Sequence, residues 1–281
     1  MPTVLLLLPS ATYRASDFID AARAIGADVV VASPFRQTLA DVMGDRSLVV
    51  DLRDGAVAAR QIVEHAGRIH LDAVVGVDEQ GVLAAALASE ALGLRGNPPP
   101  AVARTRDKAA MRAALAGGGV AQPAFAVATR PGDAPVLASE LGFPCVLKPV
   151  SLSGSRGVIR VDDVAAAAAA ESRIREILGQ AGRPSDEVLL VEEYLDGDEI
   201  AVEGLLSSGA LEVLAVFDKP DPLRGPFFEE TLYVTPSRHD PALLSDAVAT
   251  VQRATEAIGL TEGPVHAELR CGPQVGRGAA A

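Results

Sequence analysis

Residues 145–158, Cys-Val-Leu-Lys-Pro-Val-Ser-Leu-Ser-Gly-Ser-Arg-Gly-Val, place a loop of serine and glycine directly after a short apolar strand. Lys148 ends that strand, so its ammonium is expected to be partly buried and to need an anionic partner. Backbone N–H groups and hydroxyls around Gly154 can approach phosphate oxygens closely. Taken alone, the stretch fits either a phosphate-binding strand and loop or an ordinary hairpin turn with a solvated lysine.

The residues on both sides of this stretch predict an α+β second half of the chain, with a unit that starts after Gly117-Gly118-Gly119. Short apolar runs alternate there with helical patterns, one of which includes six consecutive alanines at 165–170. Asp162 is expected to cap that helix, and Asp240 the last one. The expected helices are residues 108–115, 136–141, 163–178 and 241–258. The expected strands are residues 125–129, 145–149, 157–161, 188–193, 200–207, 211–219 and 265–269.

The first hundred residues predict a separate domain, residues 1–103, built on a parallel sheet. Runs of leucine and β-branched residues alternate with helical patterns, which is typical of a buried parallel sheet with helices on both faces. No G-x-G-x-x-G follows the first strand, which argues against a dinucleotide site. The run Gly96-Asn97-Pro98-Pro99-Pro100 is expected to be irregular. The expected strands are residues 3–9, 28–32, 47–51 and 72–77.

Composition limits the partners and the compartment. The 281 residues hold 25 Lys and Arg against 37 Asp and Glu, a net charge of −12. Such a surface repels polyphosphate backbones, so nucleic acid is not expected as a partner and a phosphate ligand would need local cations. No apolar run reaches the roughly 18 residues of a membrane span, and residues 4–8 lack the flanks of a signal peptide. Cys145 and Cys271 fit neither a disulfide framework nor a metal site. We expect a cytoplasmic protein without a membrane partner.

Arg106-Asp107-Lys108 stands at the start of an expected helix. A cation in the first turn opposes the helix dipole, at a cost of about 0.3–1 kcal/mol unless an anion lies there. A bound phosphate would explain the placement of Lys108. An exposed lysine paired with Asp107 is the alternative.

Two further stretches end in carboxylates. Residues 191–199, Val-Glu-Glu-Tyr-Leu-Asp-Gly-Asp-Glu, could pair backbone groups with an adenine edge and a carboxylate with ribose hydroxyls, or form only a charged strand end. Strand alternation places His266, Glu268 and Arg270 on one face. Glu268 could hold Mg²⁺ there, or the three residues could be the polar face of an edge strand with a structural histidine.

The order of these motifs resembles the ATP-grasp superfamily, and within it the carboxylate–amine ligases related to amino-acid ligases and biotin-carboxylase-like enzymes. The similarity extends over nearly the whole chain. It implies a pre-ATP-grasp parallel α/β domain at 1–103 and an ATP-grasp domain at 104–281, with its lid at about 118–194. It also implies ATP and Mg²⁺ (or Mn²⁺) as cofactors, small-molecule carboxylate and amine substrates and, since relatives are often dimers, a homodimer.

The resemblance also implies roles for individual residues. Lys148 and Arg270 correspond to catalytic positions, and Glu268 to the first metal carboxylate. Glu192 and the backbone of Leu195 match the adenine edge, and Glu199 the ribose position. The full set of implied nucleotide contacts is Lys108, Lys148, Ser153, Gly154, Ser155, Glu192, Glu193, Leu195, Glu199 and Lys219. Residues 218–236, with Glu229, Glu230 and Arg238 nearby, fall where relatives form the substrate pocket.

One departure concerns the end of the chain. Relatives follow the first metal carboxylate with a Glu-x-Asn motif, but residues 272–281 contain neither Glu nor Asn and show no strand pattern. We expect this tail to fray and the chain to be incomplete at its C-terminus. Loss of outer-shell metal partners alone typically costs about 10–100-fold in activity.

Two functions therefore stay open. One is an ATP-dependent carboxylate–amine (or thiol) ligase that forms an acyl phosphate from an amino acid or a similar small carboxylate, with a bicarbonate-dependent reaction as a variant. The other is a nucleotide-binding module with little or no catalysis.

Overall fold

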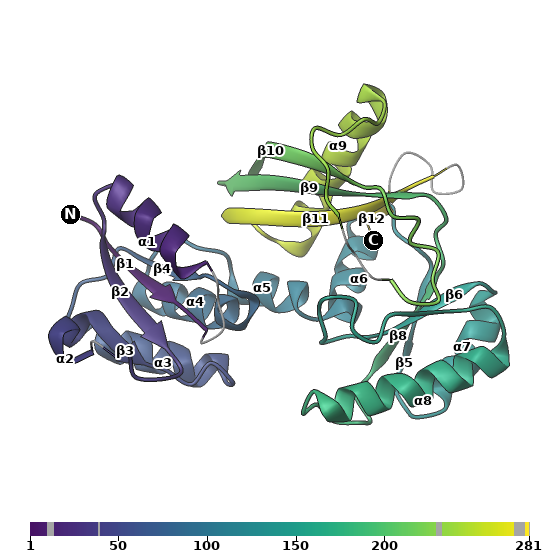
Figure 1. Cartoon of the computed structure of the whole chain (residues 1–281), viewed down its shortest axis with the longest axis horizontal. Coiled ribbons are helices and arrows are strands. Elements are labelled where there is room, and N and C mark those ends of the chain that lie inside the picture. Colours follow the sequence, from purple (N-terminus) through teal and green to yellow (C-terminus); the bar gives the residue numbers. More distant parts are fainter. Residues whose placement is uncertain (10–13, 39, 229–231, 273–278, 281) are drawn as a thin grey trace. The chain divides into compact units, whose positions relative to one another are not determined.

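The computed structural model describes residues 1–9, 14–38, 40–228, 232–272 and 279–280. The chain divides into two compact units, Met1–Ala103 and Arg104–Ala281 (Figure 1). Over the described ranges, no helix combines the length and the apolar character that crossing a bilayer requires.

The first unit is built on a parallel sheet whose strands are β1 (Thr3–Leu7), β2 (Asp28–Ser33), β3 (Ser47–Val49) and β4 (Ala73–Gly76), in the order β3-β2-β1-β4. Its helices are α1 (Ala15–Ala24), α2 (Ala40–Met43), α3 (Gly55–His65) and α4 (Glu79–Leu92). A short 3₁₀ turn occupies Gly44–Arg46.

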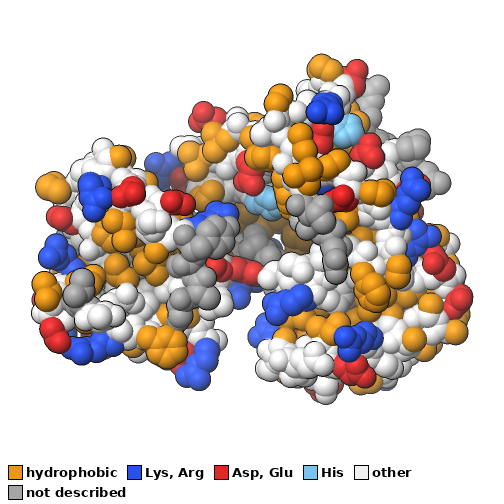
Figure 2. All heavy atoms as spheres, viewed as in Figure 1, with side chains coloured by type: hydrophobic (Ala, Val, Ile, Leu, Met, Phe, Trp, Pro, Cys, Tyr) orange, Lys and Arg blue, Asp and Glu red, His pale blue; other side chains and the backbone are white. Residues whose placement is uncertain are grey.

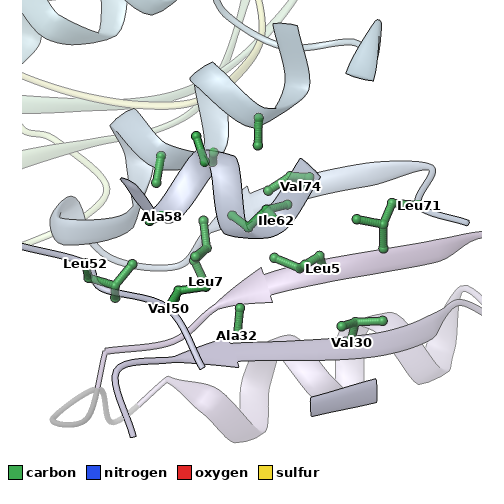
Figure 3. Close-up of a cluster of buried hydrophobic side chains, with 14 residues drawn as sticks. Leu5, Leu7, Val30, Ala32, Val50, Leu52, Ala58, Ile62, Leu71 and Val74 are labelled. Carbon is green, nitrogen blue, oxygen red and sulfur yellow. The ribbon is translucent and has the colours of Figure 1, made fainter. Parts of the chain in front are cut away.

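Both faces of this sheet are covered. Successive strand residues point to opposite faces, so Leu5 and Leu7 pack on one side and Leu6 on the other. Ile62 of α3 joins the first side (Figure 3), and Phe18 of α1 joins the second. The predicted parallel sheet with helices on both faces is therefore confirmed.

The second unit contains two antiparallel sheets. The first has the order β5-β8-β6-β7 and consists of β5 (Phe125–Ala128), β6 (Cys145–Pro149), β7 (Ile159–Val161) and β8 (Leu189–Glu193). Helices α7 (Asp133–Leu141) and α8 (Val164–Gln180) pack on it, with Leu147, Ile174 and Leu189 at the core of the contact.

The second sheet has the order β10-β9-β11-β12 and consists of β9 (Asp198–Ser207), β10 (Ala210–Lys219), β11 (Gly263–Cys271) and β12 (Ala279–Ala280). Helix α9 (Pro241–Ile258) packs Val251 against Ile200 and Leu269 of this sheet. Helix α6 (Lys108–Gly117) in turn packs Leu115 against Ile258.

Several local predictions are wrong. Pro99 begins α5 (Pro99–Thr105) instead of an irregular run, because proline fits a first helical turn, where the N–H that it lacks would have no intrahelical acceptor. Asp163, not Asp162, caps α8, and its side chain accepts from the N–H of Ala166 at 2.7 Å. Helix α7 begins at Asp133, three residues before the expected start.

The tail also departs from expectation. Residues 279–280 form β12 and pair with Leu269 and Arg270, although no strand pattern marks them. Residues 273–278 and 281 lie outside the described ranges.

Candidate functional site

The first charged cluster lies where β6 and β8 run side by side. Nζ of Lys148, on β6, lies 2.6 Å from Oε2 of Glu192 on β8. Nε of Arg112, from α6, lies 2.6 Å from Oε1 of the same carboxylate. Arg112 and Glu192 are buried, whereas 12% of the Lys148 side chain stays exposed. Glu192 therefore holds Lys148 in place and leaves part of it open to solvent.

The electrostatics of this cluster favour an anionic ligand. Burial lowers the pKa of the Lys148 ammonium, and the Glu192 carboxylate acts in the opposite direction. Burial would raise the pKa of Glu192, but Lys148 and Arg112 outweigh it and hold that pKa below its usual range. The cluster therefore contains two cations and one anion. Binding of a further negative group would stabilise this buried excess of positive charge.

Lys108 approaches the loop that follows Lys148. Its backbone N–H donates to the carbonyl of Val150 at 3.3 Å, and its ammonium donates to the carbonyl of Leu152. Asp107 accepts from the N–H of Ala109 at 2.9 Å and so caps α6. Lys108 therefore contacts the segment that directly follows Lys148 in the chain.

The loop of residues 151–158, between β6 and β7, is held in turns that expose its polar groups. Gly154 and Ser155 have φ of +63° and +53°, a conformation uncommon for a serine. Ser153 and Gly154 are exposed and Ser155 is half-buried. Arg156 donates to the carbonyl of Ser153 at 3.2 Å, and the hydroxyl of Ser151 donates to the carboxylate of Glu187 at 2.7 Å, so the loop is held at both points.

A second charged cluster spans the central strands of the other sheet. Glu199, on β9, lies in register with Lys219 of β10 on one side and with Arg270 of β11 on the other. Its Oε1 lies 2.7 Å from Nζ of Lys219, and its Oε2 lies 2.9 Å from Nε of Arg270. Lys219 also contacts Glu268, whose Oε1 lies 3.5 Å from Nε2 of His266. One sheet face thus carries alternating charges.

These ion pairs fix the protonation states of the cluster. Burial opposes the charged forms, but His266 and Lys219 lower the pKa of Glu268 to about 2. Hydrogen bonding to Glu268, and then to Glu203, raises the pKa of His266 to about 9. The pKa of Lys219 is raised by Glu268 and Glu199 against the effect of burial. Glu268 also acts on the pKa of Lys148, so the two clusters influence each other.

Glu268 alone does not make an independent metal site. Among the described residues, no group of three or more His, Cys, Asp and Glu side chains could hold a metal ion. Mg²⁺ in proteins is commonly bound through one or two carboxylates together with substrate phosphates. Glu268 offers one carboxylate of this kind, which Lys219 and His266 already contact.

Residues expected near the substrate line a cavity of about 450 Å³. Its wall combines anionic Asp218, cationic Arg238 and apolar Leu232 and Val234. Asp218 accepts from the N–H of Arg238 at 2.8 Å, which links two segments that are 20 residues apart in the sequence. The full lining is Asp198, Asp218, Lys219, Pro220, Leu232, Val234, Arg238 and His239. Glu229 and Glu230 lie outside the described residues.

Two of the expected nucleotide contacts lie apart from the charged clusters. Glu193 is exposed, and its carboxylate accepts from the N–H of Ala124 at 3.3 Å, on the sheet face opposite Glu192. Leu195 is half-buried in the link between β8 and β9. The side chain of Glu192 is occupied by its two ion pairs, so any contact with an adenine would involve its backbone.

Sequence reasoning missed Arg112, although one signal could have found it. Arg112 lies one helical turn after Lys108 and one before Leu115, so it belongs to the buried stripe of α6.

The chain holds just three lysines among its 25 basic residues, namely Lys108, Lys148 and Lys219. All three lie in the candidate site, whereas arginines supply the remaining basic surface. Figure 2 shows acidic and basic side chains interspersed over the face in view.

Comparison with known families matches both units of the chain. The family model "ATP-grasp domain" matches residues 141–275, and the model "ATP-grasp N-terminal domain" matches residues 19–96. Alanine–anticapsin ligase of Bacillus subtilis is 30% identical over 226 residues, which is 75% of this chain and 47% of that protein. The carbamoyl phosphate synthase large chain of Thermus thermophilus is 27% identical over 205 residues, 72% of this chain and 19% of that protein.

Solved structures share the fold. An L-amino acid ligase from Bacillus licheniformis gives a TM-score of 0.78 at 24% identity, covering 100% of this chain and 66% of that one. A biotin carboxylase from Campylobacter jejuni gives a TM-score of 0.72 at 16% identity, covering 99% of this chain and 64% of that one. The chain thus spans about half the length of the ligase relatives in Bacillus and a small part of the synthase. Since the two family models describe the N-terminal domain and the ATP-grasp domain of ATP-grasp proteins, in that order along the chain, the chain belongs to the ATP-grasp superfamily.

Proposed function

We propose that this chain is the nucleotide-binding part of an ATP-dependent carboxylate–amine ligase. The observation that carries the proposal is the buried ion pair of Lys148 with Glu192, beside a loop of serine and glycine that Lys108 also contacts. An ammonium held this way is preorganised for a polyphosphate, because it needs no rearrangement when the anion arrives. The similarity to alanine–anticapsin ligase supports the same reaction class.

In the proposed reaction, an oxygen of the substrate carboxylate attacks the γ-phosphorus of ATP and the bond to the β-phosphate oxygen breaks. ADP leaves and an acyl phosphate forms. The nitrogen of an amine then attacks the acyl carbon, the C–O bond to phosphate breaks, and the amine loses a proton. The products are an amide, ADP and inorganic phosphate.

The chain's own residues would lower the barrier mainly through electrostatics. Two anions must meet in the first step, so Lys108 and Lys148 would offset the repulsion between the carboxylate and the triphosphate. Arg270, held by Glu199, would neutralise the acyl phosphate. The loop around Gly154 would exclude water and so protect the acyl phosphate from hydrolysis.

The remaining assignments follow the same site. Leu195 and the backbone of Glu192 would meet the adenine, Glu199 the ribose, and Lys219 a phosphate. Glu268 would hold Mg²⁺, which would supply Lewis-acid polarisation of the phosphates when bound. We propose residues 104–281 as the ATP-grasp domain, with the lid at about 118–194, and a small carboxylate such as an amino acid in the cavity beside Lys219.

A second candidate is a nucleotide-binding module with little or no catalysis. It is favoured by the engagement of Glu268, whose carboxylate is already bound by Lys219 and His266. Calorimetry of the 281-residue chain with ATP and Mg²⁺, followed by ADP release over a panel of amino acids, separates the two candidates. Substrate-dependent ADP release supports the ligase. Binding without release under any substrate pair supports the module, and the absence of binding contradicts both.

A further inference from the structure

Two arginines from different sheets lie near the same aromatic ring. The guanidinium carbon of Arg160, on β7, lies 4.3 Å from the ring centroid of Tyr194, and that of Arg270, on β11, lies 5.9 Å from it. Such distances are those of cation–π contacts. Tyr194 itself lies in the link between β8 and β9, directly before Leu195.

Each of these arginines also holds the same loop, residues 221–228. Nη1 of Arg160 donates to the carbonyl of Arg224 at 2.9 Å, and its backbone N–H donates to the carbonyl of Pro226 at 2.9 Å. Nη2 of Arg270 donates to the carbonyl of Leu223 at 3.0 Å. Three carbonyls of one short loop are therefore fixed by two residues from separate sheets.

The loop approaches Arg160 closely enough to require glycine. Gly225 has φ of +85°, and a Cβ built on it would lie 2.8 Å from Cβ of Arg160. Any other residue would be strained there and would push the loop away from β7. Ile159 and Phe227 add a backbone bridge between the same two segments.

Both arginines are themselves oriented by carboxylates. Nε of Arg160 donates to Asp162 at 3.0 Å, and Nε of Arg270 donates to Glu199 at 2.9 Å. Because a guanidinium is planar and presents its donors in a fixed fork, one such side chain can hold a carboxylate and a carbonyl and still stack on a ring.

From this arrangement we infer that Arg160 is a positioning residue, which together with Tyr194 and Arg270 clamps the 221–228 loop in the place where it forms the substrate side of the site. The loop lines a cavity of about 480 Å³ at residues 221–227. The clamp therefore connects the loop that lines this cavity to the link between β8 and β9, which we expect to contact the nucleotide. The identity of the loop's ligand, a small carboxylate or amine, rests on the proposed function, whereas the clamp itself does not.

Tryptic cleavage after Arg224 measures the clamp directly. Arg224 is exposed and its carbonyl accepts from Arg160, so loss of this hydrogen bond should make its peptide bond to Gly225 easier to cleave. We expect R160A to be cleaved there about tenfold faster than the parent chain, in line with loss of a hydrogen bond to a charged group. Mass spectrometry of the 1–224 fragment gives the rate.

Two matched variants make the result specific. Arg173 is exposed on α8 and pairs with its helical neighbour Glu176, so R173A removes one arginine without touching the loop. Its cleavage rate after Arg224 is expected to equal that of the parent. Y194F keeps the ring and is also expected to cleave at the parent rate. Equal rates for R160A and the parent would overturn the inference, as would equal acceleration in R173A.

If R160A does not fold by circular dichroism, R160K serves instead. Lysine keeps the charge but lacks the planar fork of donors, so R160K is expected to be cleaved faster than the parent, and an unchanged rate overturns the clamp.

In an active chain, R160A should raise KM for the carboxylate or amine about tenfold and leave KM for ATP unchanged. General destabilisation would not give this difference between the two KM values, and equal effects on both contradict a positioning role. Faster cleavage of R160A in a chain that never releases ADP would retain the clamp and reject the ligase proposal.

Discussion

Lys219 and Glu199 face each other in register across β10 and β9, with Nζ and Oε1 2.7 Å apart. Directly opposing residues on one sheet face are the closest side-chain neighbours that two strands offer. Arg270 occupies the matching position on the other side of Glu199. The order of strands therefore sets one carboxylate between two cations.

Removing Lys148 should abolish nucleotide turnover without unfolding the chain. K148A leaves Glu192 paired with Arg112, so the buried carboxylate keeps one cation. We expect ADP release to fall by at least about 100-fold, the cost of losing one preorganised group at a developing charge. An ADP-release assay and a thermal melt on the same sample check this. Unchanged turnover would remove Lys148 from the mechanism.

Removing Arg112 should instead destabilise the fold. The Arg112 side chain is only 1% exposed, whereas 12% of Lys148 reaches solvent, so R112M breaks the more deeply buried of the two ion pairs of Glu192, at a cost of about 3–5 kcal/mol. The matched exposed change R173M should cost less than about 1 kcal/mol in free energy of unfolding. Urea titration of both variants decides the point, and losses of similar size in the two would show that the Arg112 pair adds no special stability.

Lys148 and Lys219 should differ in reactivity toward a reagent that acylates amines. Burial lowers the pKa of Lys148, which increases its neutral and nucleophilic fraction, whereas carboxylates raise the pKa of Lys219. At pH 8 we expect Lys148 to be acylated before Lys219, and saturating ATP to suppress labelling of Lys148. Peptide mass spectrometry follows both sites in one sample, with the N-terminal amine as an internal reference. Labelling of Lys148 that ATP does not change would argue against phosphate contact.

His266 should make stability depend on pH in the alkaline range. Its pKa is raised from 6.5 to about 9, mainly by Glu268 and Glu203, so its ion pairs stabilise the fold fully below about pH 6.5 and are lost as pH rises through 9. Melting temperatures of the parent should therefore fall between these values. H266Q, which cannot ionise, should flatten that part of the profile while acid denaturation remains, and parallel profiles for the two proteins would exclude His266 as the cause.

Much of the fold follows from local pattern. The parallel sheet of the first unit was predictable because runs such as residues 4–8 are apolar on both faces, and only a sheet covered on both sides buries them. The ends of the helices were harder to predict from the sequence. Asp163 shows why, since a shift of one residue in a cap leaves the hydrophobic pattern unchanged, whereas the run of three prolines at 98–100 concealed the start of α5.

The sequence by itself predicted charged residues near the ends of strands, at Lys148, Glu192 and Glu199, and a glycine-serine loop that can turn. The tertiary structure decided which of them meet. Arg112 finds Glu192 80 residues away, and Tyr194 lies near arginines from two sheets. The physical reason is that strand register and helix packing are set by the burial of distant apolar faces, which no local spacing of charged residues encodes.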